Sequence, residues 1–141
     1  MSEKENKNIK TKINKKVKPL ILLVEDDEFL LNMYKTKIVL EKYDVIVANN
    51  GEKAYKQIVE KKPDLILLDI VLPKMTGFEV LAKIKNEDDQ IRNIPVILLT
   101  NLGQREDIKR GLELGAKEYL IKAHFLPSEV MEKIKKVLDK K

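Results

Sequence analysis

Acidic side chains directly follow two short apolar runs of the sequence. Glu25 and Asp26 follow the first run, and Asp69 follows a later one. Carboxylates that are brought together repel one another, and a hard divalent cation with oxygen ligands, such as Mg²⁺, relieves that repulsion. A carboxylate can also act as a nucleophile and carry an aspartyl phosphate. These residues predict a divalent-ion site suited to phosphoryl transfer, with Asp69 as the best candidate nucleophile.

Two further polar side chains follow apolar runs nearer the end of the chain. The hydroxyl of Thr100 can donate to a phosphate oxygen, and the ammonium of Lys122 can pair with the same anion as a point charge. Phosphoryl transfer depends mostly on positioning and charge neutralisation, which these groups would supply together. Taken singly, Asp69 or Thr100 is as well explained as a helix cap, and Lys122 as a solvated lysine. The functional interpretation therefore depends on all of them meeting.

The elements that must position these groups alternate along the chain. Runs rich in Val, Ile and Leu predict strands that are covered on both faces, and the segments between them have helical spacing. The strands are expected at 20–24, 44–48, 65–68, 95–99 and 118–121. Right-handed crossovers then give a single α/β domain, a flavodoxin-like (βα)5 fold with a doubly wound parallel sheet in the order 2-1-3-4-5. Strands one and three flank the point where that order reverses, so Glu25, Asp26 and Asp69 are expected to converge there.

Composition excludes several other kinds of site. The 141 residues contain no cysteine and a single histidine, His124, so disulfides, Cys-based zinc sites and multi-His metal sites are excluded. The apolar runs are far shorter than the roughly 20 residues that span a membrane, and the N-terminus lacks the apolar core of a secretory signal. We therefore expect a soluble, cytoplasmic protein with no membrane partner.

The positive charge is concentrated at the N-terminus. Residues 1–18 hold seven Lys and two Glu, whereas 19–141 hold 21 basic and 21 acidic residues. We expect a flexible Lys-rich arm over 1–18 and one folded domain over 19–141. Binding of nucleic acid or an anionic membrane by the arm is the less favoured alternative, because the arm lacks interleaved aromatic residues and an amphipathic face.

Five segments in chain order resemble the receiver domain of two-component response regulators, the CheY-like family. They read ILLVEDD (21–27), PDLILLD (63–69), PKMTG (73–77), PVILLT (95–100) and GAKEYLIK (115–122). The resemblance covers about residues 19–140. Each segment alone is weak evidence, but five in the right order at the ends of the expected elements form a specific match.

The resemblance implies a role for each matching position. Asp69 is similar to the phosphorylated aspartate. Asp26 is similar to the acid that binds Mg²⁺ directly, Glu25 to the acid that acts through water, and the backbone carbonyl of Val71 completes the protein's share of the metal shell. The remaining acid of the segment, Asp27, is better explained as the N-cap of the first helix.

The resemblance also implies a switch. Thr100 and Lys122 are similar to the switch hydroxyl and the phosphate-pairing lysine. Tyr119 is similar to the switch aromatic, which turns inward as Thr100 moves toward the phosphate; a packed strand aromatic is the alternative for it. The surface of the fourth helix, fifth strand and fifth helix then changes shape, as in a two-state element biased by a local charge.

The implied function is a phosphoacceptor switch rather than an enzyme. It takes a phosphoryl group from a sensor histidine kinase or a phosphotransfer protein, catalysing only its own phosphorylation and dephosphorylation. We expect no DNA-binding or enzymatic output domain in this chain, so output acts through an unknown protein partner or through the N-terminal arm. One alternative is a degenerate receiver that binds a partner constitutively. A haloacid-dehalogenase-type phosphatase is disfavoured, since that family needs an acid two residues after the nucleophile and here Val71 stands there.

One segment departs from the family pattern. The family usually has Lys-Pro-Phe after the fifth strand, with a cis peptide before the proline, whereas this chain has Lys122-Ala123-His124-Phe125. A cis bond before a non-proline residue costs about 2.5–4 kcal/mol. We therefore predict a trans bond or a reshaped loop, with His124 as an ordinary loop residue.

Overall fold

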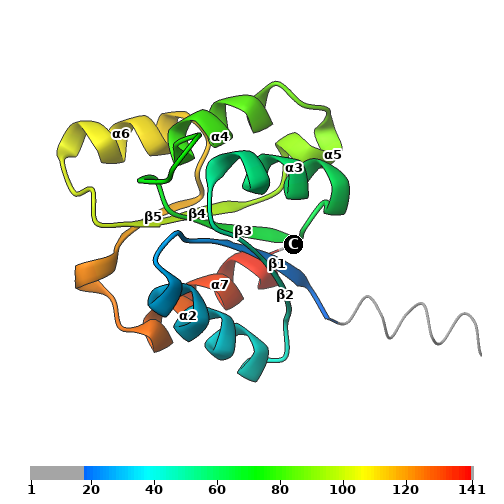
Figure 1. Cartoon of the computed structure of the whole chain (residues 1–141), viewed down its shortest axis with the longest axis vertical. Coiled ribbons are helices and arrows are strands. Elements are labelled where there is room, and N and C mark those ends of the chain that lie inside the picture. The colour runs from blue at the N-terminus through cyan, green and yellow to red at the C-terminus, as the bar shows by residue number, and fades with distance from the viewer. Residues whose placement is uncertain (1–17, 141) are drawn as a thin grey trace, which may run out of the picture.

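The computed structural model describes residues 18–140, and they form a five-stranded parallel sheet with helices on both faces (Figure 1). The Lys-rich arm expected at 1–18 lies outside the described residues except for Lys18. The strands are β1 (Leu20–Val24), β2 (Asp44–Ala48), β3 (Leu65–Leu68), β4 (Val96–Thr100) and β5 (Glu118–Ile121). The helices are α2 (Glu28–Leu40), α3 (Gly51–Lys61), α4 (Gly77–Lys85), α5 (Asp89–Arg92), α6 (Arg105–Glu113) and α7 (Pro127–Asp139), with a 3-10 turn η1 (Lys122–His124) after β5.

The sheet order is β2-β1-β3-β4-β5, which confirms the predicted fold class. Four strands have the predicted bounds, but β4 spans Val96–Thr100 rather than the predicted 95–99. Proline has no N–H to donate to a neighbouring strand, so Pro95 joins the sheet only through its carbonyl, which accepts from Ile66 N at 3.0 Å. The short helix α5 and the turn η1 were not predicted.

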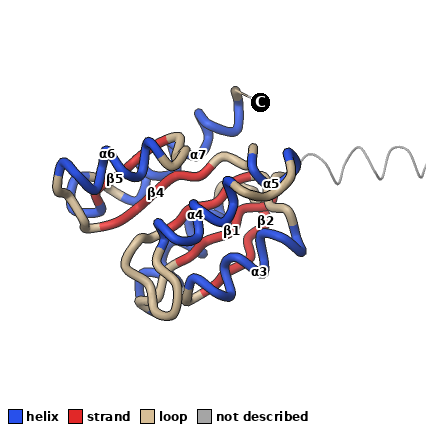
Figure 2. Tube along the Cα trace, turned by 90° about the horizontal axis from the view of Figure 1, so that it is seen from above, coloured by secondary structure: helices blue, strands red, loops and turns tan. Residues whose placement is uncertain are grey.

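Two hydrophobic cores cover the two faces of the sheet. On one face α3, α4, α5 and α6 pack against strand residues such as Leu22, Leu68 and Leu98. On the other face α2 and α7 pack against residues such as Leu23 and Leu67, and Figures 1 and 2 show these layers from two directions. Successive strand residues point to opposite faces, so strands that are buried on both faces are apolar throughout. Within residues 18–140, no helix is both long and apolar enough to cross a bilayer.

Side-chain caps fix where three of the helices begin. Asp27 accepts from Leu30 N at 2.9 Å at the start of α2, and Asn50 accepts from Lys53 N at 2.9 Å at the start of α3. Thr76 and Glu79 form a reciprocal capping box at the start of α4. The Asp27 contact confirms the predicted N-cap. Because each of these helices follows a strand, the caps also fix the ends of the loops at the carboxyl edge of the sheet.

We predict that Leu67→Ala lowers the free energy of unfolding by about 2–5 kcal/mol, because it deletes a fully buried side chain from the central strand β3. The matched control Leu40→Ala removes the same atoms from a side chain that is 70% exposed, and it should change stability by less than about 0.5 kcal/mol. Urea denaturation measures both values. Equal losses for the two variants would contradict the position of Leu67 in the core.

Candidate functional site

Three carboxylates meet at the carboxyl edge of the sheet. Glu25, Asp26 and Asp69 each offer an oxygen atom that lies within 4.8 Å of the others. β1 and β3 are neighbouring parallel strands, with Val24 opposite Leu68, so the acids that follow these two residues reach the same level. Glu25 and Asp69 are buried, at 3% and 6% exposed, whereas Asp26 faces solvent. The structure thus brings together the acids that the sequence predicts to converge.

Lys122 directly follows β5, the last strand in the sheet order, and its side chain reaches this cluster. Its Nζ lies 2.6 Å from Oε1 of Glu25 and 2.8 Å from Oδ2 of Asp69, and its side chain is only 12% exposed. All peptide bonds from residue 18 to 140 are trans, and the chain turns through η1 after β5. The predicted trans bond is therefore confirmed, and Lys122 reaches the acids without a cis peptide. His124 lies exposed in this turn, as expected of a loop residue.

Burial and charge pairing shift the pKa values of Glu25 and Lys122. Burial raises the pKa of the Glu25 carboxyl above its usual 4.5, although hydrogen bonds from Lys122 and from the Asp27 N–H oppose the rise. Burial alone would lower the pKa of Lys122, but its hydrogen bonds to Asp69 and Glu25 outweigh that effect and raise the pKa above 10.5. Lys122 is therefore a cation at neutral pH, and it lies between the carboxyl groups of Glu25 and Asp69.

The two oxygens of Asp69 have different partners. Oδ1 accepts from the backbone N–H groups of Ile70 at 2.7 Å and Val71 at 3.3 Å, while Oδ2 faces the Lys122 ammonium. Val71 itself lies in the exposed loop after β3. Helix α4 approaches the backbone here: a Cβ on Gly77 would lie 2.3 Å from the Asp69 carbonyl oxygen, and Gly77 N donates to Ile70 O at 2.8 Å. These contacts hold the Asp69 carboxylate in one orientation.

Thr100 and Tyr119 are connected through the backbone of Leu102. Thr100 is fully buried at the end of β4, and its hydroxyl accepts from Leu102 N at 3.3 Å. The hydroxyl of Tyr119 donates to Leu102 O at 2.6 Å. A hydroxyl that accepts such a bond can still donate its own hydrogen to another acceptor. Burial, with the charges of Asp107 and Asp69 adding to it, raises the pKa of Tyr119 to about 12, so its phenol stays protonated.

Sequence reasoning missed Leu102. Its part in the site is played by its backbone N–H and carbonyl, so its side-chain type gives no signal. The sequence marks Thr100 and Tyr119 as separate candidates, and only the fold shows that one peptide segment links them.

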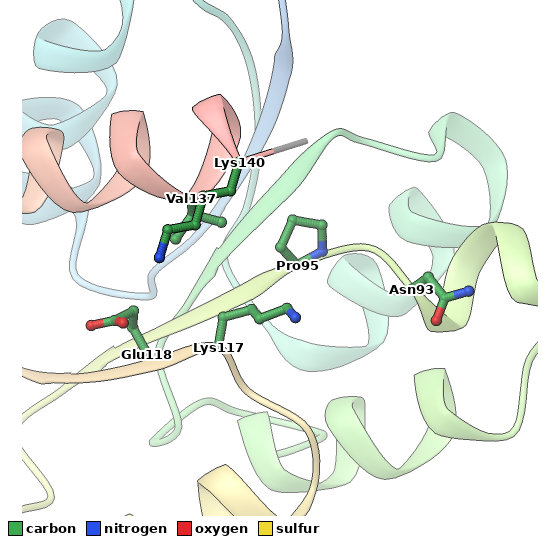
Figure 3. Close-up of a pocket in the computed structure, with 6 residues that line it drawn as sticks. All are labelled: Asn93, Pro95, Lys117, Glu118, Val137 and Lys140. Carbon is green, nitrogen blue, oxygen red and sulfur yellow. The ribbon is translucent and has the colours of Figure 1, made fainter.

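One pocket of the structure lies away from this chemistry. A pocket of about 320 Å³ lies at the amino ends of β4 and β5, next to the end of α7 (Figure 3). It is lined by Asn93, Pro95, Lys117, Glu118, Val137 and Lys140. Since the acidic cluster is at the carboxyl ends of the strands, this pocket is at the opposite edge of the sheet. This pocket therefore takes no part in the candidate site.

We predict that Lys122→Met destabilises the protein by about 1–3 kcal/mol at pH 7, because it leaves two buried carboxylates without their cation. The loss should shrink as the pH falls toward the raised pKa of Glu25, because a protonated carboxyl no longer needs a cation. Lys117→Met changes an exposed lysine at the other edge of the sheet and serves as the control. Urea denaturation between pH 5 and 8 tests this, and a loss that does not depend on pH would contradict it.

Comparisons with known proteins agree with this geometry. Residues 21–135 match the family model described as the response regulator receiver domain. The chain is 39% identical over 118 residues to the alkaline phosphatase synthesis transcriptional regulatory protein PhoP of Bacillus subtilis, an alignment that covers 84% of this chain and 48% of PhoP. It is 36% identical over 118 residues to the phosphate regulon transcriptional regulatory protein PhoB of Pseudomonas aeruginosa, with 84% and 51% covered. The chain therefore spans about half the length of these relatives.

Solved structures show the same architecture. A CheY-like response regulator receiver domain protein from Methanospirillum hungatei superposes with a TM-score of 0.80 at 31% identity, covering 87% of this chain and 95% of that one. The BeF3-activated receiver domain of RstA from Klebsiella pneumoniae gives 0.77 at 29% identity, with 84% and 97% covered. Receiver domains bind Mg²⁺ at an acidic pocket, and this chain has an acidic cluster at the corresponding edge of its sheet. The chain belongs to the response regulator receiver domain family, the signalling switches of two-component systems.

Proposed function

We propose that this chain is a phosphoacceptor switch that takes a phosphoryl group on Asp69 with the help of Mg²⁺. The observation that carries the proposal is the position of the Asp69 carboxylate, which lies 2.8 Å from the Lys122 ammonium and within the cluster that Glu25 and Asp26 complete. These are the parts that phosphoryl transfer to a carboxylate requires: a nucleophile, oxygen ligands for a metal and a fixed cation.

The charges of the cluster fit a divalent cation. The cluster holds three carboxylates, and its one ammonium pairs with two of them, which leaves an excess of negative charge in a partly buried site. We propose that Asp26 and Asp69 bind Mg²⁺ directly, that Glu25 acts through water, and that the carbonyl of Val71 completes the protein ligands. When bound, the ion would neutralise charge on the transferred phosphoryl group.

The chain's own residues account for the transfer. An oxygen of Asp69 attacks the phosphorus of a phosphohistidine as the phosphorus–nitrogen bond breaks, and the donor histidine leaves with the electron pair of that bond. Lys122, which now neutralises Glu25 and Asp69, is in position to pair with the arriving phosphoryl oxygens. The hydroxyl of Thr100 can donate to one of them while it still accepts from Leu102 N.

We propose that the signal leaves the site through Thr100 and Tyr119. Both side chains contact Leu102, which lies in the loop between β4 and α6. A phosphoryl group that attracts the Thr100 hydroxyl would therefore bias the position of this loop and of Tyr119, and with them the surface formed by α6, β5 and α7.

Two kinds of protein partner follow from this proposal. The donor is a sensor histidine kinase or a phosphotransfer protein, which must place a phosphohistidine at the acidic cluster. Phe29, in the first turn of α2 close to Asp26, is 77% exposed and offers such a donor an apolar contact beside the site. The second partner is a downstream protein that reads the surface of α6, β5 and α7.

We expect acetyl phosphate with Mg²⁺ to add the mass of one phosphoryl group to the wild-type protein and none to Asp69→Asn. The matched control Asp27→Asn should be phosphorylated normally, because asparagine caps a helix about as well as aspartate. Intact-mass spectrometry reads the result. A wild-type protein that gains no mass would instead indicate a degenerate receiver that binds its partner constitutively.

Mg²⁺ affinity offers an independent prediction. Asp26→Asn should weaken binding by roughly tenfold or more, since it removes a charged ligand, whereas Glu28→Gln, an exposed acid in the next helix turn, should leave it nearly unchanged. For the wild type, affinity should fall as the pH is lowered through the raised pKa of Glu25, because a proton then competes with the ion. Isothermal titration calorimetry measures all three quantities, and equal affinities for the two variants would contradict the proposed ligands.

A further inference from the structure

A glycine in the interior of α6 lies against the ring of Tyr119. Gly111 is buried, and α6 packs over β5 (Figure 1). A Cβ on Gly111 would lie 2.9 and 3.1 Å from Cδ2 and Cε2 of Tyr119, and 2.6 Å from Cδ1 of Leu98. Contacts of a Cβ below 3.0 Å are essentially never seen in proteins. A side chain at position 111 would therefore compete for space with both Leu98 and the Tyr119 ring.

Helix propensity does not explain a glycine here. Glycine weakens a helix interior relative to alanine, because it loses more backbone entropy on folding. The φ of Gly111 is also not positive, so the backbone does not require glycine at this position. What the missing side chain supplies is space, which the Tyr119 ring shares with the side chain of Leu98.

The helix is also held from another side. The guanidinium of Arg110 lies over the ring of Phe78 in α4, 4.4 Å from its centroid, and Phe78 is buried. Moving α6 away from the sheet would break this contact, whereas the Tyr119 ring is only partly buried and can turn about its side-chain bonds. A side chain at position 111 should therefore displace the ring before it displaces the helix.

The place of the ring matters because of what its hydroxyl contacts. In the position beneath α6, the hydroxyl of Tyr119 donates to Leu102 O, and Leu102 N donates to the Thr100 hydroxyl. A ring that leaves this position cannot keep the bond to Leu102, so its connection to Thr100 is lost.

We infer that Gly111 is a positioning residue of the switch: the space left by its missing side chain holds the Tyr119 ring beneath α6, so the size of residue 111 sets the balance between the inner and outer positions of the ring. The consequence for signalling rests on the proposed function. The ring position itself does not, and it can be measured in the unphosphorylated protein.

The first test is NMR of protein labelled in the tyrosine rings, with the Tyr119 signals assigned by Tyr119→Phe. In Gly111→Ala, we expect the Tyr119 ring signals to move to those of a solvent-exposed tyrosine. The matched control is Gly103→Ala, in the loop before the same helix, where a Cβ would meet only the flexible tip of Ile121 at 3.3 Å. Tyr119 signals that stay unchanged in Gly111→Ala would overturn the inference.

A double-mutant cycle separates ring placement from a general loss of packing, and it also serves if Gly111→Ala folds poorly. We expect Gly111→Ala to raise the unfolding equilibrium constant roughly tenfold more when Tyr119 is present than in a Tyr119→Ala background. Equal effects in the two backgrounds would show that residue 111 acts only against Leu98, and would overturn the inference.

The third test measures the switch. With Mg²⁺ and beryllofluoride, Gly111→Ala should still bind the phosphoryl analogue at Asp69, but the amide shifts that spread to α6 in the wild type should shrink by at least half. Full wild-type shifts in α6 would overturn a role in the switch. If the wild type binds no beryllofluoride and takes up no phosphoryl group, the proposed function fails. The tyrosine-ring NMR signals and the double-mutant cycle would still show whether Gly111 positions Tyr119.

Discussion

The Lys122 ammonium holds this site together. It lies 2.6 Å from a carboxylate at the end of β1 and 2.8 Å from one at the end of β3, in surroundings where all three side chains are largely buried. Two buried carboxylates that face each other without a cation would be strongly unfavourable. The lysine therefore stabilises the unphosphorylated protein, and in the proposed function it is the cation that pairs with the phosphoryl oxygens on Asp69. The same interaction thus serves both the fold and the proposed chemistry.

The parallel sheet makes that interaction possible. Each strand delivers the residue that follows it to the same edge, and the register of β1 with β3 sets Glu25 level with Asp69. Hydrophobic cores on both faces hold the strands, so the site is built on well-packed strand ends. The proposed switch lies beside it, where Leu102 connects Thr100 to Tyr119 and where Gly111 leaves room for the tyrosine ring.

Most of the fold could be predicted from the sequence, because strands that are buried on both faces are apolar throughout and short acidic or polar segments end them. The error in β4 comes from Pro95, which is apolar but cannot donate a hydrogen bond to a neighbouring strand. The four-residue helix α5 is too short to show the hydrophobic spacing that is typical of a helix. The meeting of Glu25, Asp26, Asp69 and Lys122 followed from strand ends, whereas the role of Leu102 could not, because it depends on backbone atoms. The metal role of the Val71 carbonyl and the switch role of Tyr119 remain predictions.

A crystal structure with Mg²⁺ and beryllofluoride tests the central claim most directly, namely that side chains from separate strands form one metal and phosphoryl site. We predict beryllium bonded to an oxygen of Asp69, Mg²⁺ beside it on Asp26 and the Val71 carbonyl, and the Nζ of Lys122 moved from Glu25 to a fluorine atom. Mg²⁺ bound elsewhere, or Lys122 still between Glu25 and an unmodified Asp69 at saturating beryllofluoride, would contradict it.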